Sequence, residues 1–336
     1  MTTYPDQKLS TESTIGSWAR HPTGSRILEA FAQRAGMDSA TLNTLRNLPL
    51  SRMLAATGAP DADGVAGGLV AQLGDAGTEV PERDARQALT VPGRFGGRTV
   101  VVTGAASGIG RAVASRVALE GGVVVAVDLS EERLVQLSNE MPEGAIRPVN
   151  ADITDAAAVA RIIEATEGRV DGLANVAGLA DDFSAIHEVS DEMLERVFAV
   201  NVFGLVRLTR AVVPLMLEAG EGSIVNVASE AAFRGSSAGL AYTASKHAVV
   251  GVTRSMAFMY EPSGIRVNTV APGGTLTGMR PSIASGLGPE RVRSFAVPVP
   301  IALPEHLAAS ITFLLSDDGV NVSGALLASD GGESAF

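Results

Sequence analysis

The chain has 336 residues, 46% of them hydrophobic and 19% charged, which indicates a folded globular protein and excludes wholesale disorder. Its net charge of -11 argues against a nucleic-acid partner, because phosphate binding needs concentrated Lys and Arg. The absence of cysteine excludes disulfides and thiolate sites, and it fits a reducing compartment. Residues 1–13 are polar, and apolar stretches such as 122–127 are too short to span a bilayer. We therefore expect a cytoplasmic protein with no membrane partner.

The part of the chain before residue 95 differs in character from the rest. Apolar periodicity and capping residues predict a small helical domain over 1–75, with helices at 25–35, from Asp38 or Ser39 to 45, at 50–57 and at 62–73. Residues 76–97 contain Gly, Pro and charged residues and predict a linker. This part contains no phosphate loop, metal-ligand spacing or acid pair, so we interpret it as a docking or oligomerisation appendage.

From Arg98 onward, short Val-rich strands alternate with amphipathic helices. The predicted strands are 99–102, 123–127, 145–149, 172–176, 223–227 and 266–270. The predicted helices are 110–119, 131–139, 155–165, 191–217 and 242–260. Alternation of this kind predicts an α/β fold with a Rossmann-like, doubly wound parallel sheet over 98–336.

A glycine-rich turn joins the first of these strands to the helix that follows. Gly104, Gly108 and Gly110 permit a tight turn and let the backbone approach a pyrophosphate, while the helix amino terminus offers free N–H groups. The spacing is G-x-x-x-G-x-G, which differs from the general G-x-G-x-x-G fingerprint. The position between a strand and a helix nevertheless favours dinucleotide binding.

Asp128 ends the second strand, where a carboxylate can accept hydrogen bonds from both ribose hydroxyls of NAD. It would repel the 2′-phosphate of NADP, and no Lys or Arg at 105–107 or 129–130 neutralises such a phosphate. We therefore predict NAD as the cofactor; the alternative is a helix cap at the end of the strand.

Two further strand ends belong to the predicted nucleotide site. Asp152 follows the third strand, where its side chain either meets the adenine edge or caps the helix that begins near Thr154. Small residues in the Asn-Val-Ala-Gly sequence at 175–178 leave room for a nucleotide across the strand ends.

The candidate catalytic residues follow the fifth strand. Ser229 lies just past that strand, and Tyr242 and Lys246 are one turn apart on one face of a long helix. A free tyrosine has a pKa of about 10, and a Lys ammonium together with the positive nicotinamide ring of NAD+ is expected to lower it. Ser229 can hold a substrate oxygen while Tyr242 exchanges its proton and the cofactor takes or gives the hydride.

These motifs identify a family resemblance. Residues 98–332 resemble the short-chain dehydrogenase/reductase family in its single-domain, non-extended form. The matching features are the turn at 104–110, Asn-Val-Ala-Gly at 175–178, Ser229, Tyr-Thr-Ala-Ser-Lys at 242–246, and Pro272-Gly273. Val176 replaces a common second asparagine, which should change packing more than chemistry, and the extension before residue 95 lies outside the family pattern.

The resemblance also implies roles that the residues alone do not. Asn201 matches an asparagine that completes a proton-relay tetrad through water, and Lys246 binds the nicotinamide ribose. Thr275 and Thr277 are implied to meet the carboxamide and the phosphates. The predicted catalytic residues are Asn201, Ser229, Tyr242 and Lys246. The predicted cofactor site comprises Gly104, Ser107, Gly108, Ile109, Gly110, Asp128, Leu129, Asp152, Ile153, Asn175, Ala177, Gly178, Tyr242, Lys246, Pro272, Gly273, Thr275 and Thr277.

We expect the substrate to meet residues 179–183, residues 230–234 and a lid over 278–300, which form a partly apolar pocket. The four histidines are scattered, and we predict no metal site. The leading hypothesis is an NAD-dependent secondary-alcohol dehydrogenase or carbonyl reductase, oxidative in direction if the cellular NAD+/NADH ratio governs. Alternatives are a 3-oxoacyl-thioester reductase and a non-catalytic nucleotide-sensing protein on the same fold. As in relatives, the helices at 191–217 and 242–260 are expected to pair in a homodimer or homotetramer.

Overall fold

The chain folds into two compact units, which we describe separately. The computed structural model describes residues 8–56, 61–78, 89–279, 281–295 and 300–335. The first unit contains Met1–Ala88, Gly274–Leu276 and Val297–Leu303. The second unit contains Leu89–Gly273, Thr277–Ala296 and Pro304–Phe336.

The first unit is helical and has its own apolar core. Its elements are α1 (Ile15–Arg20), α2 (Pro22–Arg34), α3 (Ser39–Thr44), α4 (Leu50–Ala56), α5 (Ala62–Ala71) and a 3-10 turn at Gly74–Ala76. Trp18 is fully buried and packs in one cluster with apolar side chains from four of these helices. The sequence pattern missed α1, because six residues are too few to show a helical period. Helix α2 starts earlier than predicted, since the His21 imidazole accepts the N–H groups of Thr23 and Gly24.

The second unit is built on a seven-stranded parallel sheet with strand order β3-β2-β1-β4-β5-β6-β7. The strands are β1 (Thr99–Thr103), β2 (Val123–Asp128), β3 (Ile146–Asn150), β4 (Gly172–Asn175), β5 (Gly222–Val227), β6 (Ile265–Pro272) and β7 (Leu326–Ser329). The strand order reverses between β1 and β4, and ligands of such sheets bind outside the carboxyl ends at this point. The predicted α/β, doubly wound fold is confirmed.

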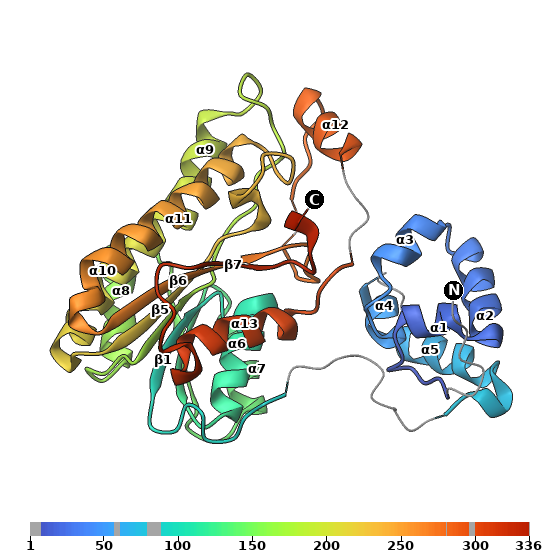
Figure 1. Cartoon of the computed structure of the whole chain (residues 1–336), viewed down its shortest axis with the longest axis horizontal. Helices are drawn as coiled ribbons and strands as arrows, with labels where there is room; N and C mark the ends of the chain where they lie inside the picture. The colour runs from blue at the N-terminus through green and yellow to red at the C-terminus, as the bar shows by residue number, and fades with distance from the viewer. Residues whose placement is uncertain (1–7, 57–60, 79–88, 280, 296–299, 336) are drawn as a thin grey trace. The chain divides into compact units, whose positions relative to one another are not determined.

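Helices cover both faces of the sheet, as Figure 1 shows. One face carries α6 (Gly108–Leu119), α7 (Glu131–Glu140) and α13 (Pro304–Leu315). The other carries α8 (Ala156–Ala165), α9 (Asp191–Phe198), α10 (Leu205–Ala219) and α11 (Leu240–Tyr260). Both strand faces are therefore buried, which explains why β1 and β2 are valine-rich throughout and do not alternate with polar residues.

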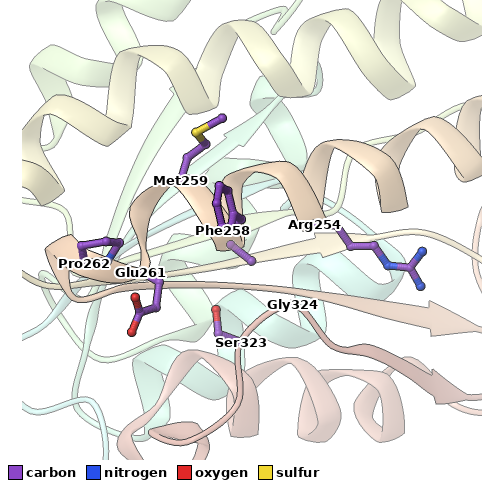
Figure 2. Close-up of a pocket in the computed structure, with 8 residues that line it drawn as sticks. Arg254, Phe258, Met259, Glu261, Pro262, Ser323 and Gly324 are labelled. Atoms are coloured by element: carbon purple, nitrogen blue, oxygen red, sulfur yellow. The ribbon is translucent and has the colours of Figure 1, made fainter.

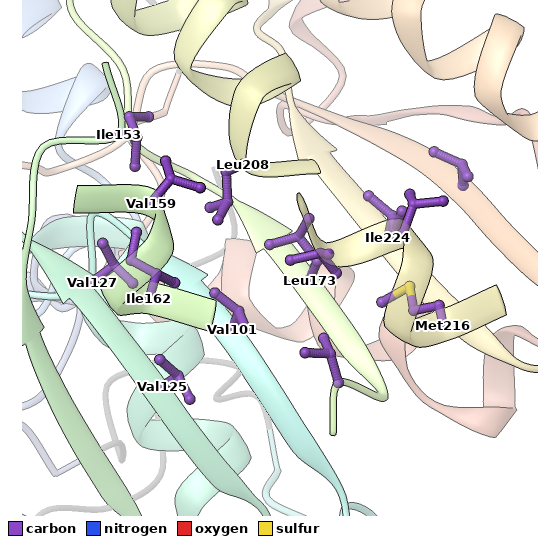
Figure 3. Packing of buried hydrophobic residues seen from close by; sticks show 14 of the residues in the cluster. Val101, Val125, Val127, Ile153, Val159, Ile162, Leu173, Leu208, Met216 and Ile224 are labelled. Carbon is purple, nitrogen blue, oxygen red and sulfur yellow. The ribbon is translucent and has the colours of Figure 1, made fainter. Parts of the chain in front are cut away.

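The core between the sheet and helices α8 and α10 holds the carboxyl ends of the strands in place. Figure 3 shows Val101, Val127 and Leu173 from the strands packing against Ile162 of α8 and Leu208 of α10. All five side chains are essentially inaccessible to solvent. Burying a side chain of this size contributes roughly 1.5–3 kcal/mol, so this layer fixes the edge from which the candidate functional residues project.

Some elements differ from the sequence-based prediction. The helix predicted over 191–217 is interrupted by a π-helical segment at Ala199–Gly204 that contains Asn201. The predicted lid contains a helix, α12 (Leu287–Ser294), and the last strand, β7, was not predicted. Residues 89–97, predicted as linker, pack into the second unit, because Phe95 is buried and Arg94 pairs with the buried Glu120 at 2.5 Å.

One helical stretch within the described residues, Asp191–Ala219, is long and apolar enough to cross a membrane. Half of its most apolar window is buried inside the fold. A core helix passes the same test of length and composition, and the packing of α10 against α8 accounts for this one.

Candidate active site

The glycine turn after β1 has the shape required to receive a phosphate group. Gly104 and Gly108 have φ of +68° and +51°, which favours glycine, and a Cβ on Gly110 would lie 2.1 Å from the Gly104 carbonyl oxygen. The N-cap residue Ser107 makes no side-chain hydrogen bond to the first turn of α6. The N–H groups at this helix start are thus left for an anion, as the nucleotide prediction requires.

Thr277 lies against this turn, since a Cβ on Gly108 would meet its side chain at 3.1 Å. Thr275, the other threonine of the prediction, belongs to the helical unit, where it forms a bridge with Ala302. Within the second unit the structure therefore brings together Thr277 and the glycine turn.

Asp128 lies at the carboxyl end of β2 beside the glycine turn. Its carboxylate accepts the Ala106 N–H at 3.0 Å through one oxygen and the Ser130 N–H at 3.0 Å through the other. Each carboxylate oxygen has a second lone pair, which remains available for a ribose hydroxyl. The two backbone bonds hold the carboxylate at the turn.

Of the residues at the other strand ends, some stabilise the fold and others border the predicted nucleotide site. Asp152 accepts the Thr154 N–H at 2.8 Å, so this exposed side chain stabilises its own turn, whereas Asp155 and not Asp152 caps α8. The Asn175 side chain is buried and donates to Thr209 and Asn226 at 3.0 and 2.8 Å. Asn175 thus supports the strands, and the backbone of Ala177 is the part that borders the glycine turn, 3.2 Å from a Cβ on Gly104.

The remaining predicted cofactor residues are divided between surface and packed positions. Leu129 is 70% exposed at the end of β2, where it leaves the edge of the site open. Ile153 is buried and packs against Gly204 in the π-helical segment. A Cβ on Gly273 would lie 2.7 Å from the Glu333 carboxylate, which explains the glycine after Pro272.

Ser229, Tyr242 and Lys246 form one group at the carboxyl end of β5. The first turns of α11 carry Tyr242 and Lys246, and the Lys246 Nζ lies 5.3 Å from the centroid of the Tyr242 ring. Lys246 is buried and donates to the Val227 carbonyl at 3.0 Å. Tyr242 is partly exposed and is hydrogen-bonded to Ser229. Part of the residue is thus exposed, although the protein atoms around its phenol desolvate it.

The electrostatics of this group in the chain alone favour the neutral phenol. In the chain alone, burial raises the pKa of Tyr242 to about 12, because its effect exceeds that of the Ser229 hydrogen bond, and the charges of Asp181 and Glu230 raise it further. We expected Lys246 and the positive nicotinamide ring together to lower this pKa. Burial also lowers the pKa of Lys246 to about 8, so its charge is weakly held. The protein by itself therefore keeps Tyr242 as a neutral phenol.

Asn201 connects the π-helical segment to the loop after β4. Its amide accepts the Leu179 N–H at 2.8 Å and donates to the Leu179 carbonyl at 3.0 Å and to Ser245 at 3.0 Å. A Cβ on Gly178 would lie 3.3 Å from the Asn201 Oδ1 and 3.4 Å from the Lys246 Nζ. Asn201 and Lys246 thus border the same glycine, and the water relay through Asn201 stays a prediction.

The sequence predicted residues 179–183 and 230–234 to meet the substrate, but it did not predict the contacts that their charged side chains make around this group. Asp181 is buried and accepts the Tyr242 N–H at 2.9 Å, and Arg234 pairs with Glu230 and, at 2.7 Å, with Glu333. Glu230 and Arg234 are four residues apart in one loop, whereas Asp181 and Glu333 come from distant segments that the fold brings to it. Arg234 is engaged by two carboxylates, so the described charge near Tyr242 is predominantly negative.

Comparisons with known proteins identify the family of this chain. The family model described as short chain dehydrogenase matches residues 98–288. The 3beta-hydroxysteroid dehydrogenase 2 of Eggerthella lenta is 37% identical over 250 residues, covering 71% of this chain and 96% of its own. D-threitol dehydrogenase of Mycolicibacterium smegmatis is 38% identical over 244 residues, covering 71% and 94%.

Solved structures show the same likeness. The crystal structure of levodione reductase has a TM-score of 0.65 and 33% identity, covering 72% of this chain and 99% of that one. A 3-ketoacyl-(acyl-carrier-protein) reductase from Brucella melitensis, complexed with NADH, has a TM-score of 0.65 and 32% identity, covering 71% and 99%. The chain belongs to the short-chain dehydrogenase family, and it is an oxidoreductase of that family.

The high pKa of Tyr242 predicts opposite pH dependences for the two directions of an alcohol–ketone reaction. With Tyr242 as the acid/base, oxidation needs the phenolate, so its kcat/KM should rise above about pH 7 until Tyr242 of the NAD+ complex is ionised, whereas reduction needs the phenol and should stay nearly constant to about pH 9. Initial rates in both directions across this range test the prediction, and an oxidation rate that does not change with pH would contradict it.

Proposed function

We propose that this protein is an NAD-dependent oxidoreductase that interconverts a neutral secondary alcohol and a ketone, with Tyr242 as the acid/base. One observation carries the proposal: Ser229, Tyr242 and Lys246 lie together at the carboxyl edge of the sheet, the same edge that carries the glycine turn. We also propose a cytoplasmic location, which the absence of cysteine supports.

The chain's own residues supply binding, orientation and a proton path. Ser229 donates a hydrogen bond to the substrate oxygen, and Tyr242 takes the hydroxyl proton during oxidation or returns it during reduction. Bound NAD+ supplies the hydride acceptor and a positive ring when alcohol is oxidised. Lys246, anchored by the Val227 carbonyl, holds its ammonium beside the Tyr242 ring, where its charge favours the phenolate.

Asp128 supports NAD over NADP. Its carboxylate is fixed by Ala106 and Ser130 at the turn that fits the phosphates, and a negative charge there disfavours a ribose 2′-phosphate. Neither 105–107 nor 129–130 contains the Lys or Arg that would compensate such a phosphate.

The surroundings of Tyr242 support a neutral, partly apolar substrate. Asp181 and Glu230 place negative charge near the phenol, and Arg234 is already paired, so an anionic group on the substrate would be repelled. The segment predicted as a lid exposes Met279, Ile283 and Leu287, which suits an apolar surface on the substrate. These features favour a neutral ring or chain over an acyl thioester on a phosphate-bearing carrier.

An assay of cofactor reduction tests the proposed activity. Wild-type protein with NAD+ should oxidise members of a panel of steroids, cyclic alcohols, polyols and hydroxyacyl thioesters, followed as NADH absorbance. Tyr242→Phe should lower kcat by at least about 100-fold, because it removes the proton acceptor and leaves NAD+ binding nearly intact. Turnover retained in Tyr242→Phe would reject the role of Tyr242. Confirmed NAD+ binding without turnover across the panel would favour the nucleotide-sensing alternative.

The cofactor preference has its own test in Asp128→Ala. The loss of hydrogen bonds to a charged acceptor should raise the Kd of NAD+ by about tenfold to 100-fold, with a smaller effect on NADP+. Glu131→Ala removes an equal charge from the exposed first turn of α7 and serves as the control. Titration calorimetry with both cofactors measures the ratio, and equal losses for NAD+ and NADP+ would remove the specificity argument.

We further propose that a second copy of this chain covers the end of α11. Figure 2 shows a surface pocket lined by Phe258 and Met259 of this helix and by Ser323 of a neighbouring loop. Phe258 is 79% exposed and Met259 is 64% exposed, an unusual position for two large apolar side chains in sequence. Helix α11 is one of the two helices that the family resemblance implies in subunit pairing, which selects a second copy as the occupant.

Sedimentation velocity tests this assembly. The wild type should sediment as a dimer or tetramer, and Phe258→Asp should shift it toward monomer because it places a charge in an apolar interface. Val135→Asp, an exposed site on α7 at the other face of the sheet, is the control and should leave the assembly intact. A monomeric wild type would reject the proposal.

A further inference from the structure

The loop that follows β4 touches two functional elements at once. Its residues 181–188 contact the start of α11, which carries Tyr242, and the start of α12 in the segment predicted as a lid. Two acidic side chains, Asp181 and Glu188, make most of these contacts. Neither residue belongs to the predicted catalytic or cofactor set.

Asp181 caps the catalytic helix from outside it. The N-cap residue of α11 is Gly239, which has no side chain to satisfy the first turn. Asp181 accepts the Gly239 N–H at 3.1 Å and the Tyr242 N–H at 2.9 Å. A Cβ on Gly239 would lie 2.6 Å from the Asp181 carboxylate, so glycine is required for this approach. The buried carboxylate therefore sets the position of the Tyr242 backbone.

Glu188 caps α12, the helix in the segment predicted as a lid. One oxygen accepts the Leu287 N–H at 2.6 Å, and the other accepts the N–H groups of Gly288 and Ala185 at 3.0 Å. Gly286 has a φ of +145°, and a Cβ there would lie 2.4 Å from the Glu188 carboxylate. These hydrogen bonds keep the pKa of Glu188 below its ordinary value, with a smaller contribution from His187.

The middle of the loop joins these two ends rigidly. Phe183 has a φ of +67°, a conformation that a side chain of this size rarely adopts. A Cβ on Gly288 would meet the Phe183 carbonyl oxygen at 2.2 Å, and the next carbonyl, Ser184, accepts the Leu240 N–H at 3.1 Å. Successive peptide units thus contact the lid and the catalytic helix, so a continuous chain of contacts joins the two.

We propose that residues 181–188 are a positioning loop in which Glu188 fixes the lid over the substrate and Asp181 fixes Tyr242, so that ordering of the lid orders the catalytic helix. The proposal rests on the proposed function for its kinetic consequences. Its structural consequence, the coupling between α12 and the first turn of α11, does not depend on any substrate.

The charge of Asp181 provides a readout that a merely structural residue would lack. The groups that face the Tyr242 phenol are Ser229 and Lys246, with the carboxylates of Asp181 and Glu230. Removal of the Asp181 charge should lower the pKa of Tyr242, since this charge raises it in the wild type. The pH profile of alcohol oxidation should then move to lower pH.

The test compares Asp181→Asn and Glu188→Gln with Asp155→Asn, a carboxylate outside the loop that caps α8 by accepting the Ala157 N–H. Hydrogen exchange by mass spectrometry should show faster exchange at both 239–242 and 284–288 in the first two variants, and unchanged exchange in the control. Exchange confined to the end of the loop that carries the substitution would overturn the coupling, whether or not a substrate is known.

Kinetics with a substrate of the wild type complete the test. Asp181→Asn should lower kcat by about tenfold and shift the oxidation profile to lower pH, while Glu188→Gln should raise the KM for the alcohol several-fold. If Asp181→Asn has a lower melting temperature but an unchanged kcat and pH profile, the role of Asp181 is structural only. A wild type that turns over no alcohol or ketone would reject the proposed function, while the exchange result would still decide the coupling. If Asp181→Asn does not fold, the exchange pattern of Glu188→Gln decides whether the two helix starts are coupled.

Discussion

The burial of Tyr242 beside an ammonium group is the constraint on which this active site depends. An isolated phenol placed there is held neutral, because desolvation outweighs the hydrogen bond from Ser229 and raises the pKa to about 12. Lys246 is buried, and the Val227 carbonyl at the end of β5 accepts a hydrogen bond from it. Under the proposed function, the chain provides a proton donor for ketone reduction, and oxidation requires the positive charge of bound NAD+ to favour the phenolate.

The fold serves this constraint by bringing distant segments to one sheet edge. The reversal of strand order between β1 and β4 places the glycine turn, the loop after β4 and the end of β5 together. The valine-rich core beneath them holds these strand ends in position. Glycines at 104, 110 and 178 allow backbones and side chains to approach where a Cβ would collide or crowd. The segments at this edge can therefore approach one another only because these three positions carry no side chain.

The sequence predicted the sheet and the motif residues well, because both leave local signals. Buried strands such as β1 and β2 consist mainly of valine, and Tyr242 and Lys246 are one helical turn apart. The contacts of Asp181, Glu188 and Arg234 could not be predicted, since each joins loops far apart in the chain. The role of Asn175 in bonding Asn226 and the raised pKa of Tyr242 depend on burial, which a single sequence does not give.

Ultraviolet absorbance of tyrosinate, compared between wild type and Tyr242→Phe with and without NAD+, tests the central claim directly. Only three tyrosines occur in the chain, so the difference between the two proteins isolates Tyr242. We expect no Tyr242 phenolate between about pH 7 and pH 9 in the free protein, and a phenolate signal in this range when NAD+ is bound. Identical wild-type and Tyr242→Phe spectra in the presence of NAD+ would contradict it.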